Sequence, residues 1–227
     1  MPVADLLRAA GTDFVPIVDG NVLPDQPRAL FNSGNFAKVP YILGATADEG
    51  TFFFLGVPPV TTQDEYLTAL RELYGDLADE VAAIYPPEGF ASPQDALARA
   101  YGDSALVCST EDNARRAAAS SADVWIYNFA RPTLLGRAAH GGEIAYVFGS
   151  VLFLPTAIDE AIALAMQGYW TRFARTGDPN GEGALLWPRY DDASDQHLNF
   201  DAETTVITGF RRSECEFWWS VYDREFE

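Results

Sequence analysis

Apolar and polar residues alternate in blocks along the chain, and the periods of these blocks predict strands separated by helices. Residues 39–43 (VPYIL) and 123–130 (DVWIYNFA) are short apolar runs, as in strands that are buried on both faces. Residues 196–210 predict a terminal hairpin, and residues 14–18 predict a short strand before a turn at Asp19 and Gly20.

Helical periods fill most of the sequence between these runs. Residues 61–75 carry Glu65 three positions after Thr62, which is the capping-box pattern that opens an amphipathic helix. A long helix is predicted to end at Gly177, because a glycine and then a proline follow its last apolar turn. Further helical segments are predicted at residues 27–32, 76–86, 92–103, 104–121 and 213–226.

The alternation of strands and helices indicates an α/β protein. Only two strongly buried strands are visible in the sequence, which is too few for a complete doubly wound sheet. The chain is therefore expected to form one part of a larger sheet.

The composition is that of a folded protein with an acidic surface. Of the 227 residues, 48% are hydrophobic, so the chain can bury a substantial core. Its 15 basic and 33 acidic residues give a net charge of −18, which disfavours nucleic acid and anionic membrane as partners. No apolar run approaches the roughly 20 residues that a membrane helix needs, and the first residues lack the pattern of a signal peptide.

Two cysteines, Cys108 and Cys215, lie 107 positions apart (215 − 108), and neither belongs to a CxxC pair. Together with two scattered histidines they offer no metal-ligand spacing, so no metal site is expected. The sequence leaves two alternatives for the cysteines, separate buried thiols or a bridge. A bridge would stabilise the fold by roughly 4–5 kcal/mol and would indicate an oxidising compartment.

Two residues, Glu49 and His140, carry candidate chemistry. Glu49 follows a predicted buried strand, and ligand chemistry in open α/β sheets collects at the carboxyl ends of strands. His140 lies among small residues in a loop after the second β-rich run, where glycines leave the backbone free to present the imidazole. Singly, each is explained as well by a turn acid or a loop histidine. Together they match the later members of a Ser…Asp/Glu…His order, in which the acid orients the imidazole that moves the serine proton.

Three other features of the sequence fall outside this pattern. Asp48 is expected to be a solvated turn residue, and His197, in the polar segment DQHLNF, is expected at the surface. No G-x-S-x-G nucleophile elbow occurs in the chain, and Ser150 follows a glycine without completing that pattern. The sequence thus contains a candidate acid and base but no identifiable nucleophile.

The chain resembles the C-terminal part of the type-B carboxylesterase and cholinesterase family of α/β-hydrolases. Residues 14–54 are similar to the family segment that leads into its catalytic glutamate, and residues 140–149 (HGGEIAYVFG) resemble the segment that carries its catalytic histidine. The segment YWTRFARTGDPN, followed by WPRY, is similar to the family's late helix and its exit. The resemblance runs from about Phe14 to the end of the chain.

The resemblance implies the C-terminal portion of an α/β-hydrolase fold. Its central sheet would be mixed and mostly parallel, flanked by helices, and incomplete without the N-terminal half. Residues 1–227 would belong to a single carboxylesterase domain. The resemblance also implies a disulfide between Cys108 and Cys215 that ties a helix to the C-terminal helix.

The resemblance also implies roles for five residues. Glu49 would be the acid of the catalytic triad, and His140 would be its base. Glu143 would join a buried polar network behind the site. Phe52 and Phe53 would line the acyl and alcohol pockets, with simple core packing as the alternative for each.

The implied function is that of a serine-dependent carboxylic ester hydrolase, which works through an acyl-enzyme and needs no metal or organic cofactor. The serine and the Gly-Gly oxyanion loop would lie on an N-terminal half that is absent here. That half, as a separate chain or a missing segment, and a small ester substrate are the expected partners. The chain alone is expected to be inactive.

An alternative function from another class is a non-catalytic adhesion or scaffold member of the same fold. Such a protein has no chemical reason to keep both Glu49 and His140, which favours the enzyme. The implied disulfide favours a secreted or periplasmic location, with the cytoplasm as the alternative.

Overall fold

The computed structural model describes residues 2–3, 5, 16–120, 122–133, 135–150 and 156–225. The chain divides into two compact units, Met1–Phe36 and Ala37–Glu227. Within the described residues, none of the helices has the length and apolar character needed to cross a bilayer.

In the first unit, the helix predicted at residues 27–32 is confirmed as α2 (Pro27–Ser33). The turn at Asp19 is also present, because its carboxylate accepts hydrogen bonds from three backbone amides that follow it. The strand predicted at residues 14–18 is wrong over its described part, since residues 16–18 form no strand and are exposed. Pro16 has no amide to donate to a ladder, and exposed side chains gain nothing from burial. Residues 14 and 15 lie outside the described residues.

The second unit is built on a four-stranded sheet with the order β1 (Tyr41–Thr46), β2 (Val124–Phe129), β3 (Gln196–Phe200) and β4 (Thr204–Thr208). The first three strands run parallel, and the β3–β4 hairpin is antiparallel. The predicted mixed, mostly parallel sheet is thereby confirmed, together with the terminal hairpin. Strand β1 forms one edge of the sheet, where it pairs with β2 alone among the strands that the structure describes.

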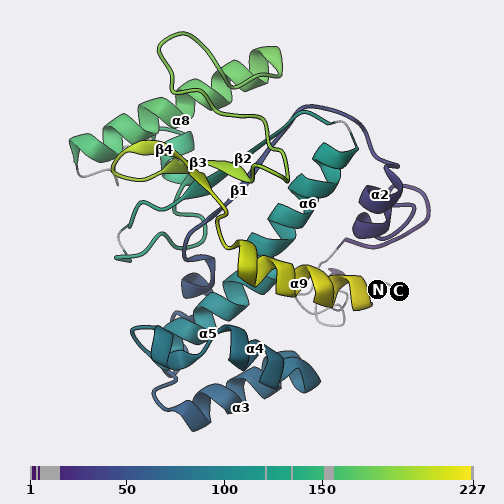
Figure 1. Ribbon diagram of the computed structural model, residues 1–227, viewed down its shortest axis with the longest axis vertical. Helices are drawn as coiled ribbons and strands as arrows, with labels where there is room; N and C mark the ends of the chain where they lie inside the picture. The colour runs from purple at the N-terminus through teal and green to yellow at the C-terminus, as the bar shows by residue number, and fades with distance from the viewer. Residues whose placement is uncertain are drawn as a thin grey trace. The chain divides into compact units, whose positions relative to one another are not determined.

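Strand β2 lies between two helical layers (Figure 1), and successive side chains along a strand point to opposite faces of the sheet. Trp125 and Phe129 pack in a core with α8 (Ala157–Thr176). Ile126 faces the opposite side of the sheet, which α6 (Cys108–Ala119) covers. Both faces of this strand are therefore buried, as its nearly continuous apolar sequence predicts.

A second core forms among the helices, where buried Tyr66, Leu70 and Leu97 pack with Trp218. The predicted capping box at Thr62 is confirmed at the start of α3. The remaining helical elements of the described chain are α3 (Gln63–Tyr74), α4 (Ala78–Ile84), α5 (Pro93–Gly102), α7 (Ile144–Val147) and α9 (Arg212–Glu225), with the short η1 (Glu49–Phe54), η2 (Gly75–Leu77), η3 (Pro87–Gly89) and η4 (Asp103–Val107).

The disulfide implied by the resemblance is confirmed, because Cys108 and Cys215 are bonded. It joins the first residue of α6 to α9 across a sequence separation of 107 residues. The Trp219 indole also donates a hydrogen bond to the Cys108 carbonyl oxygen at 3.0 Å. The same pair of helices is therefore fixed by a covalent bond and a buried hydrogen bond.

Candidate active site

The carboxylate of Glu49 and the imidazole of His140 are in direct contact. Glu49 Oε2 lies 2.6 Å from His140 Nδ1, although the two residues are 91 positions apart. The Glu49 side chain is 6% exposed, whereas the His140 side chain is 43% exposed. Because Nδ1 is held by the acid, Nε2 is the ring nitrogen that can exchange a proton with another molecule.

The end of β1 positions the Glu49 carboxylate. The strand ends at Thr46 and η1 begins at Glu49, so the acid leaves the sheet within one short turn. Its second oxygen, Oε1, accepts a hydrogen bond from the Thr46 amide at 2.6 Å. Both carboxylate oxygens are thus bonded, which offsets the cost of removing their charge from water.

Two glycines, Gly50 and Gly102, allow η1 to approach α5 closely. A Cβ atom on Gly50 would lie 1.7 Å from the Ala98 carbonyl oxygen, and one on Gly102 would lie 2.5 Å from the Gly50 nitrogen. Only a residue without a side chain fits such a crossing. The glycine that follows Glu49 therefore allows the acid to sit directly against α5.

Asp48 holds the loop that presents His140, so its expected role as a solvated turn residue is wrong. Its backbone amide donates to the Ala138 carbonyl at 2.9 Å, and its Oδ2 accepts from the Ala138 amide at 3.3 Å. Its Oδ1 pairs with Arg99 at 3.0 Å, and its side chain is only 19% exposed. Sequence alone misplaces Asp48 because these partners come from distant segments that no local pattern connects.

Phe52 and Phe53 lie beside the imidazole, with ring centroids 5.9 and 5.2 Å from that of His140. They are 48% and 41% exposed, so simple core packing explains neither residue. Half-exposed aromatic rings next to a proton-transfer group can contact the apolar part of a ligand. Their assignment to acyl and alcohol pockets stays a prediction.

Glu143 is half-buried near the pair, and the Tyr127 hydroxyl donates to its Oε1 at 3.4 Å. Burial raises the pKa of Glu143 above its ordinary value, and the charge of Glu49 adds to the rise. Its Oε2 is buried without a hydrogen-bond partner among the described residues. Of the polar network implied behind the site, the described residues show one long hydrogen bond to Glu143, from Tyr127. The role of Glu143 stays a prediction.

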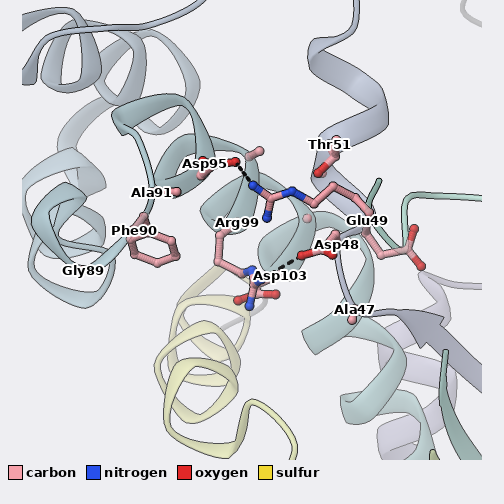
Figure 2. A pocket seen from close by; sticks show the side chains of 14 residues that line it. Ala47, Asp48, Glu49, Thr51, Gly89, Phe90, Ala91, Asp95, Arg99 and Asp103 are labelled. Carbon is pink, nitrogen blue, oxygen red and sulfur yellow. Dashed lines mark hydrogen bonds and ion pairs between the residues drawn. The ribbon is translucent and has the colours of Figure 1, made fainter. Parts of the chain in front are cut away.

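A polar pocket of about 330 Å³ lies beside Glu49 and is lined by residues of η1 and α5 (Figure 2). Its walls carry two ion pairs, Arg99 with Asp48 at 3.0 Å and Arg137 with Asp95 at 2.7 Å. The Glu49 carboxylate points away from Arg99, and the imidazole is not part of the lining. We interpret the two ion pairs in its walls as a brace between α5 and the segments that carry Glu49 and His140, because the imidazole does not open into the pocket.

The second histidine, His197, is buried rather than at the surface, with 1% of the residue exposed. It lies on β3, and its Nε2 contacts Asp195 Oδ1 at 3.1 Å. The segment has a polar sequence, but β3 lies between β2 and β4, and α6 covers the face that bears the imidazole. A central position in the sheet therefore overrides the polar pattern of the strand.

The mixed, mostly parallel sheet between helices, with Glu49 and His140 paired at the carboxyl end of a strand, has the arrangement of an α/β-hydrolase fold. The sequence matches the carboxylesterase family over residues 5–218, and the chain belongs to this family. The family and the α/β-hydrolase fold that the resemblance implies are both confirmed.

Two curated relatives illustrate how much of the family's length this chain covers. It is 27% identical to an acetylcholinesterase of Bungarus fasciatus over an alignment of 236 positions, which covers 90% of this chain and 38% of the relative. It is 28% identical to a carboxylesterase 5A of Felis catus over an alignment of 243 positions, which covers 90% of this chain and 42% of the relative. The chain thus spans about two-fifths of the length of these relatives.

Proposed function

We propose that the protein to which this chain belongs hydrolyses carboxylic esters with a serine nucleophile, and that Glu49 and His140 are the acid and base of its triad. The observation that carries the proposal is the 2.6 Å contact between Glu49 Oε2 and His140 Nδ1, with the imidazole 43% exposed. Membership of the carboxylesterase family, and the esterase names of both relatives, support the reaction class.

In the proposed reaction, His140 Nε2 takes the proton from the serine hydroxyl as the serine oxygen attacks the ester carbonyl. The imidazolium then gives this proton to the departing alcohol, and an acyl-enzyme remains. The same base activates a water molecule, which releases the carboxylic acid and restores the serine. Glu49 keeps a proton on Nδ1 and stabilises the imidazolium throughout, and the reaction requires no metal or organic cofactor.

The serine and the oxyanion donors are proposed to lie in an N-terminal part of the fold, outside these 227 residues. The coverage of 38% and 42% of the relatives supports this placement. The position of β1 at an edge of the described sheet also supports it. Strands added beside β1 would bring a nucleophile to the same carboxyl ends at which Glu49 lies. By itself, this chain is therefore expected to be inactive towards esters.

A non-catalytic scaffold of the same fold is the alternative function. The half-exposed imidazole on a buried, fully bonded carboxylate favours the enzyme, because a scaffold does not require that arrangement. The disulfide between Cys108 and Cys215 supports a secreted or periplasmic location for either protein.

The test measures hydrolysis of nitrophenyl acetate by the protein that combines this chain with its N-terminal half. We expect activity in the combined protein, none in this chain alone, and a loss of several orders of magnitude in His140→Ala. Glu72→Gln, which changes an exposed acid on α3, is the matched control and should keep full activity. A folded but inactive combined protein, or full activity in His140→Ala, would overturn the proposal.

A further inference from the structure

The second histidine belongs to a buried cluster with two carboxylates, which shares no residue with the candidate active site. His197 is on β3, Asp195 lies two positions before it, and Glu111 is on α6. Their exposed fractions are 1%, 6% and 2%, in that order. One nitrogen or oxygen atom from each side chain lies within 4.8 Å of those from the other two.

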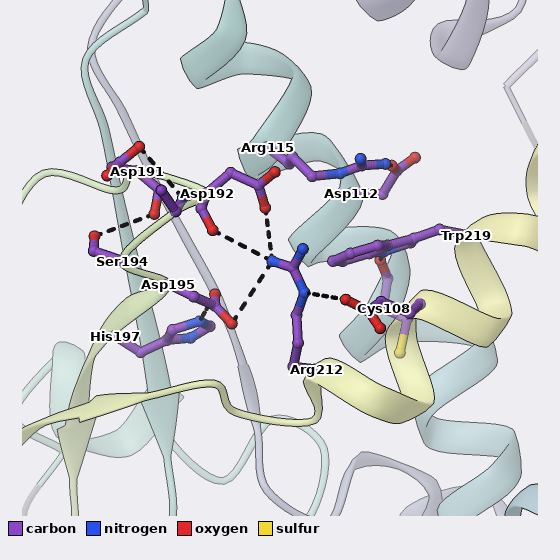
Figure 3. A network of polar contacts seen from close by, with 12 residues as sticks. Cys108, Asp112, Arg115, Asp191, Asp192, Ser194, Asp195, His197, Arg212 and Trp219 are labelled. Carbon is purple, nitrogen blue, oxygen red and sulfur yellow. Dashed lines mark hydrogen bonds and ion pairs between the residues drawn. The ribbon is translucent and has the colours of Figure 1, made fainter.

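Most carboxylate oxygens of this cluster have no hydrogen-bond partner in the part of the chain that the structure describes. His197 Nε2 contacts Asp195 Oδ1, but Asp195 Oδ2 and both Glu111 oxygens are buried without a hydrogen-bond partner among the described residues. Arg212 Nη1 is 4.0 Å from Asp195 Oδ2, whereas its short contact of 2.7 Å is with Asp192 (Figure 3). The arginine therefore leaves the charge of the cluster largely uncompensated.

Buried carboxyl groups without partners are costly, and they are neutralised by a proton or by a cation. A void of about 10 Å³ lies against Glu111 and His197. This volume admits one guest of atomic size, a water molecule or an ion.

We propose that Glu111, Asp195 and His197 bind a divalent transition-metal cation, for which Zn²⁺ is the representative. One imidazole nitrogen and two carboxylate oxygens are a donor set that zinc accepts, and the imidazole disfavours Mg²⁺ and Ca²⁺. Ligand atoms around a zinc ion are about 3–4 Å apart, so donors that lie within 4.8 Å need only small movements. The cation satisfies the unpartnered oxygens and offsets both negative charges.

The burial of all three ligands gives this site a structural role. The metal connects α6 to the β3–β4 hairpin, and Glu111 follows the disulfide-bonded Cys108 by three positions on the same helix. The disulfide and the metal thus fasten α6 to two different segments. Sequence spacing gives no sign of the site, because Glu111 and Asp195 are 84 positions apart (195 − 111).

The test uses tag-free protein that has been stripped of metal with a chelator and is then titrated with zinc chloride at neutral pH. We expect one bound equivalent by calorimetry, a higher unfolding temperature, and an X-ray absorption spectrum with nitrogen and oxygen ligands at about 2.0–2.1 Å. Glu111→Gln and His197→Gln should each weaken zinc binding at least about tenfold. Glu72→Gln, the same change at an exposed position on α3, should leave zinc binding unchanged.

His140→Ala is the second control, because an exposed imidazole paired with a carboxylate is itself a ligand for zinc. Retention of the bound equivalent in this variant supports the buried site. Loss of zinc in His140→Ala with retention in Glu111→Gln overturns the proposal. Failure of folded wild-type protein to bind zinc does the same, and so does unchanged affinity in both cluster variants. If a cluster variant does not fold, the absorption spectra of the wild type and His140→Ala decide the question.

Discussion

The two histidines of the chain each contact a carboxylate, and the two sites differ in burial and in the number of unsatisfied atoms. At His140, the acid is buried and bonded at both oxygens, while the imidazole is 43% exposed. At His197, the imidazole and both acids are buried, and three carboxylate oxygens have no hydrogen-bond partner among the described residues.

The difference shows that a contact between a histidine and a carboxylate does not by itself determine the chemistry of the pair. An accessible base on a fully bonded acid is suited to proton exchange with a substrate. An inaccessible imidazole beside unsatisfied acids is suited to a bound cation. Each of the following predictions changes one side of this comparison, from the largest expected effect to the smallest.

The largest effect is expected for His140→Ala in the protein combined with its N-terminal half. Loss of the base should lower kcat/KM for nitrophenyl acetate by about 10⁴ or more. The unfolding temperature should change little, because the side chain is 43% exposed. Steady-state kinetics and thermal unfolding check both parts. A large fall in stability with little fall in rate would mean that this pair is structural too.

Glu49→Gln should have the next largest effect, a fall in kcat/KM of about 10⁴. The amide keeps the shape of the side chain but removes the charge that stabilises the imidazolium. Glu72→Gln, at an exposed position, is the control for the same chemical change. Retention of more than a tenth of the rate by Glu49→Gln would rule out the proposed role of the acid.

Removal of the disulfide by Cys108→Ala with Cys215→Ala tests how α6, the helix that contributes Glu111 to the His197 cluster, is held in place. The bond closes a loop of 107 residues, so its loss should lower the free energy of unfolding by about 4–5 kcal/mol. Denaturant unfolding measures this change. The activity of each molecule that remains folded should persist, because Glu49 and His140 lie on other segments. If the protein without the disulfide stayed folded but lost its activity, the disulfide region and the Glu49–His140 site would be coupled.

Much of this comparison was predictable from sequence, and the successes share one cause. Strands β1 and β2, the β3–β4 hairpin and the capping box of α3 follow from patterns within a few residues. The pairing of Glu49 with His140 follows from their order along the chain and their places after buried strands. Features of this kind can be predicted from short sequence patterns or from the order of residues, without information on tertiary contacts.

The misplaced or missed residues His197, Glu111 and Asp48 share a cause, since the surroundings of each depend on tertiary contacts. The segment around His197 has a polar pattern, yet β3 lies inside the sheet under α6, so the imidazole is buried. An acid such as Glu111 is ordinary in an amphipathic helix, so its burial cannot be predicted without the packing of the hairpin against α6. Asp48 finds its partners on α5 and in the His140 loop. Sequence patterns do not state which distant segments will meet.

Gly50→Ala tests whether the close crossing of η1 and α5 positions the acid. The added methyl group would meet the Ala98 carbonyl, so either segment must move. We expect a loss of about 1–3 kcal/mol in stability and a lower kcat/KM, because Glu49 is the preceding residue. Gly89→Ala is the control, since its Cβ would have no neighbour within 4 Å. Equal effects of the two substitutions would contradict this view of the crossing.

The smallest change, about 1 kcal/mol for each pH unit, concerns Asp103, a buried acid that, unlike Glu111, has a hydrogen-bond partner among the described residues. Tyr85 donates a hydrogen bond to it at 3.1 Å, and Arg211 lies 3.7 Å away. Burial nevertheless raises the pKa of Asp103 from 3.8 to about 7. The folded state therefore binds this proton more tightly than the unfolded state does between about pH 4 and pH 7. Stability should fall as the pH rises through this window, by about 1 kcal/mol per pH unit.

Asp103→Asn should flatten that slope, as measured by denaturant unfolding at a series of pH values. Asp76→Asn, at an exposed position, should leave the slope as it is. If Glu111→Gln flattened the slope and Asp103→Asn did not, the titrating group would be Glu111. The pH dependence would then belong to the buried histidine cluster.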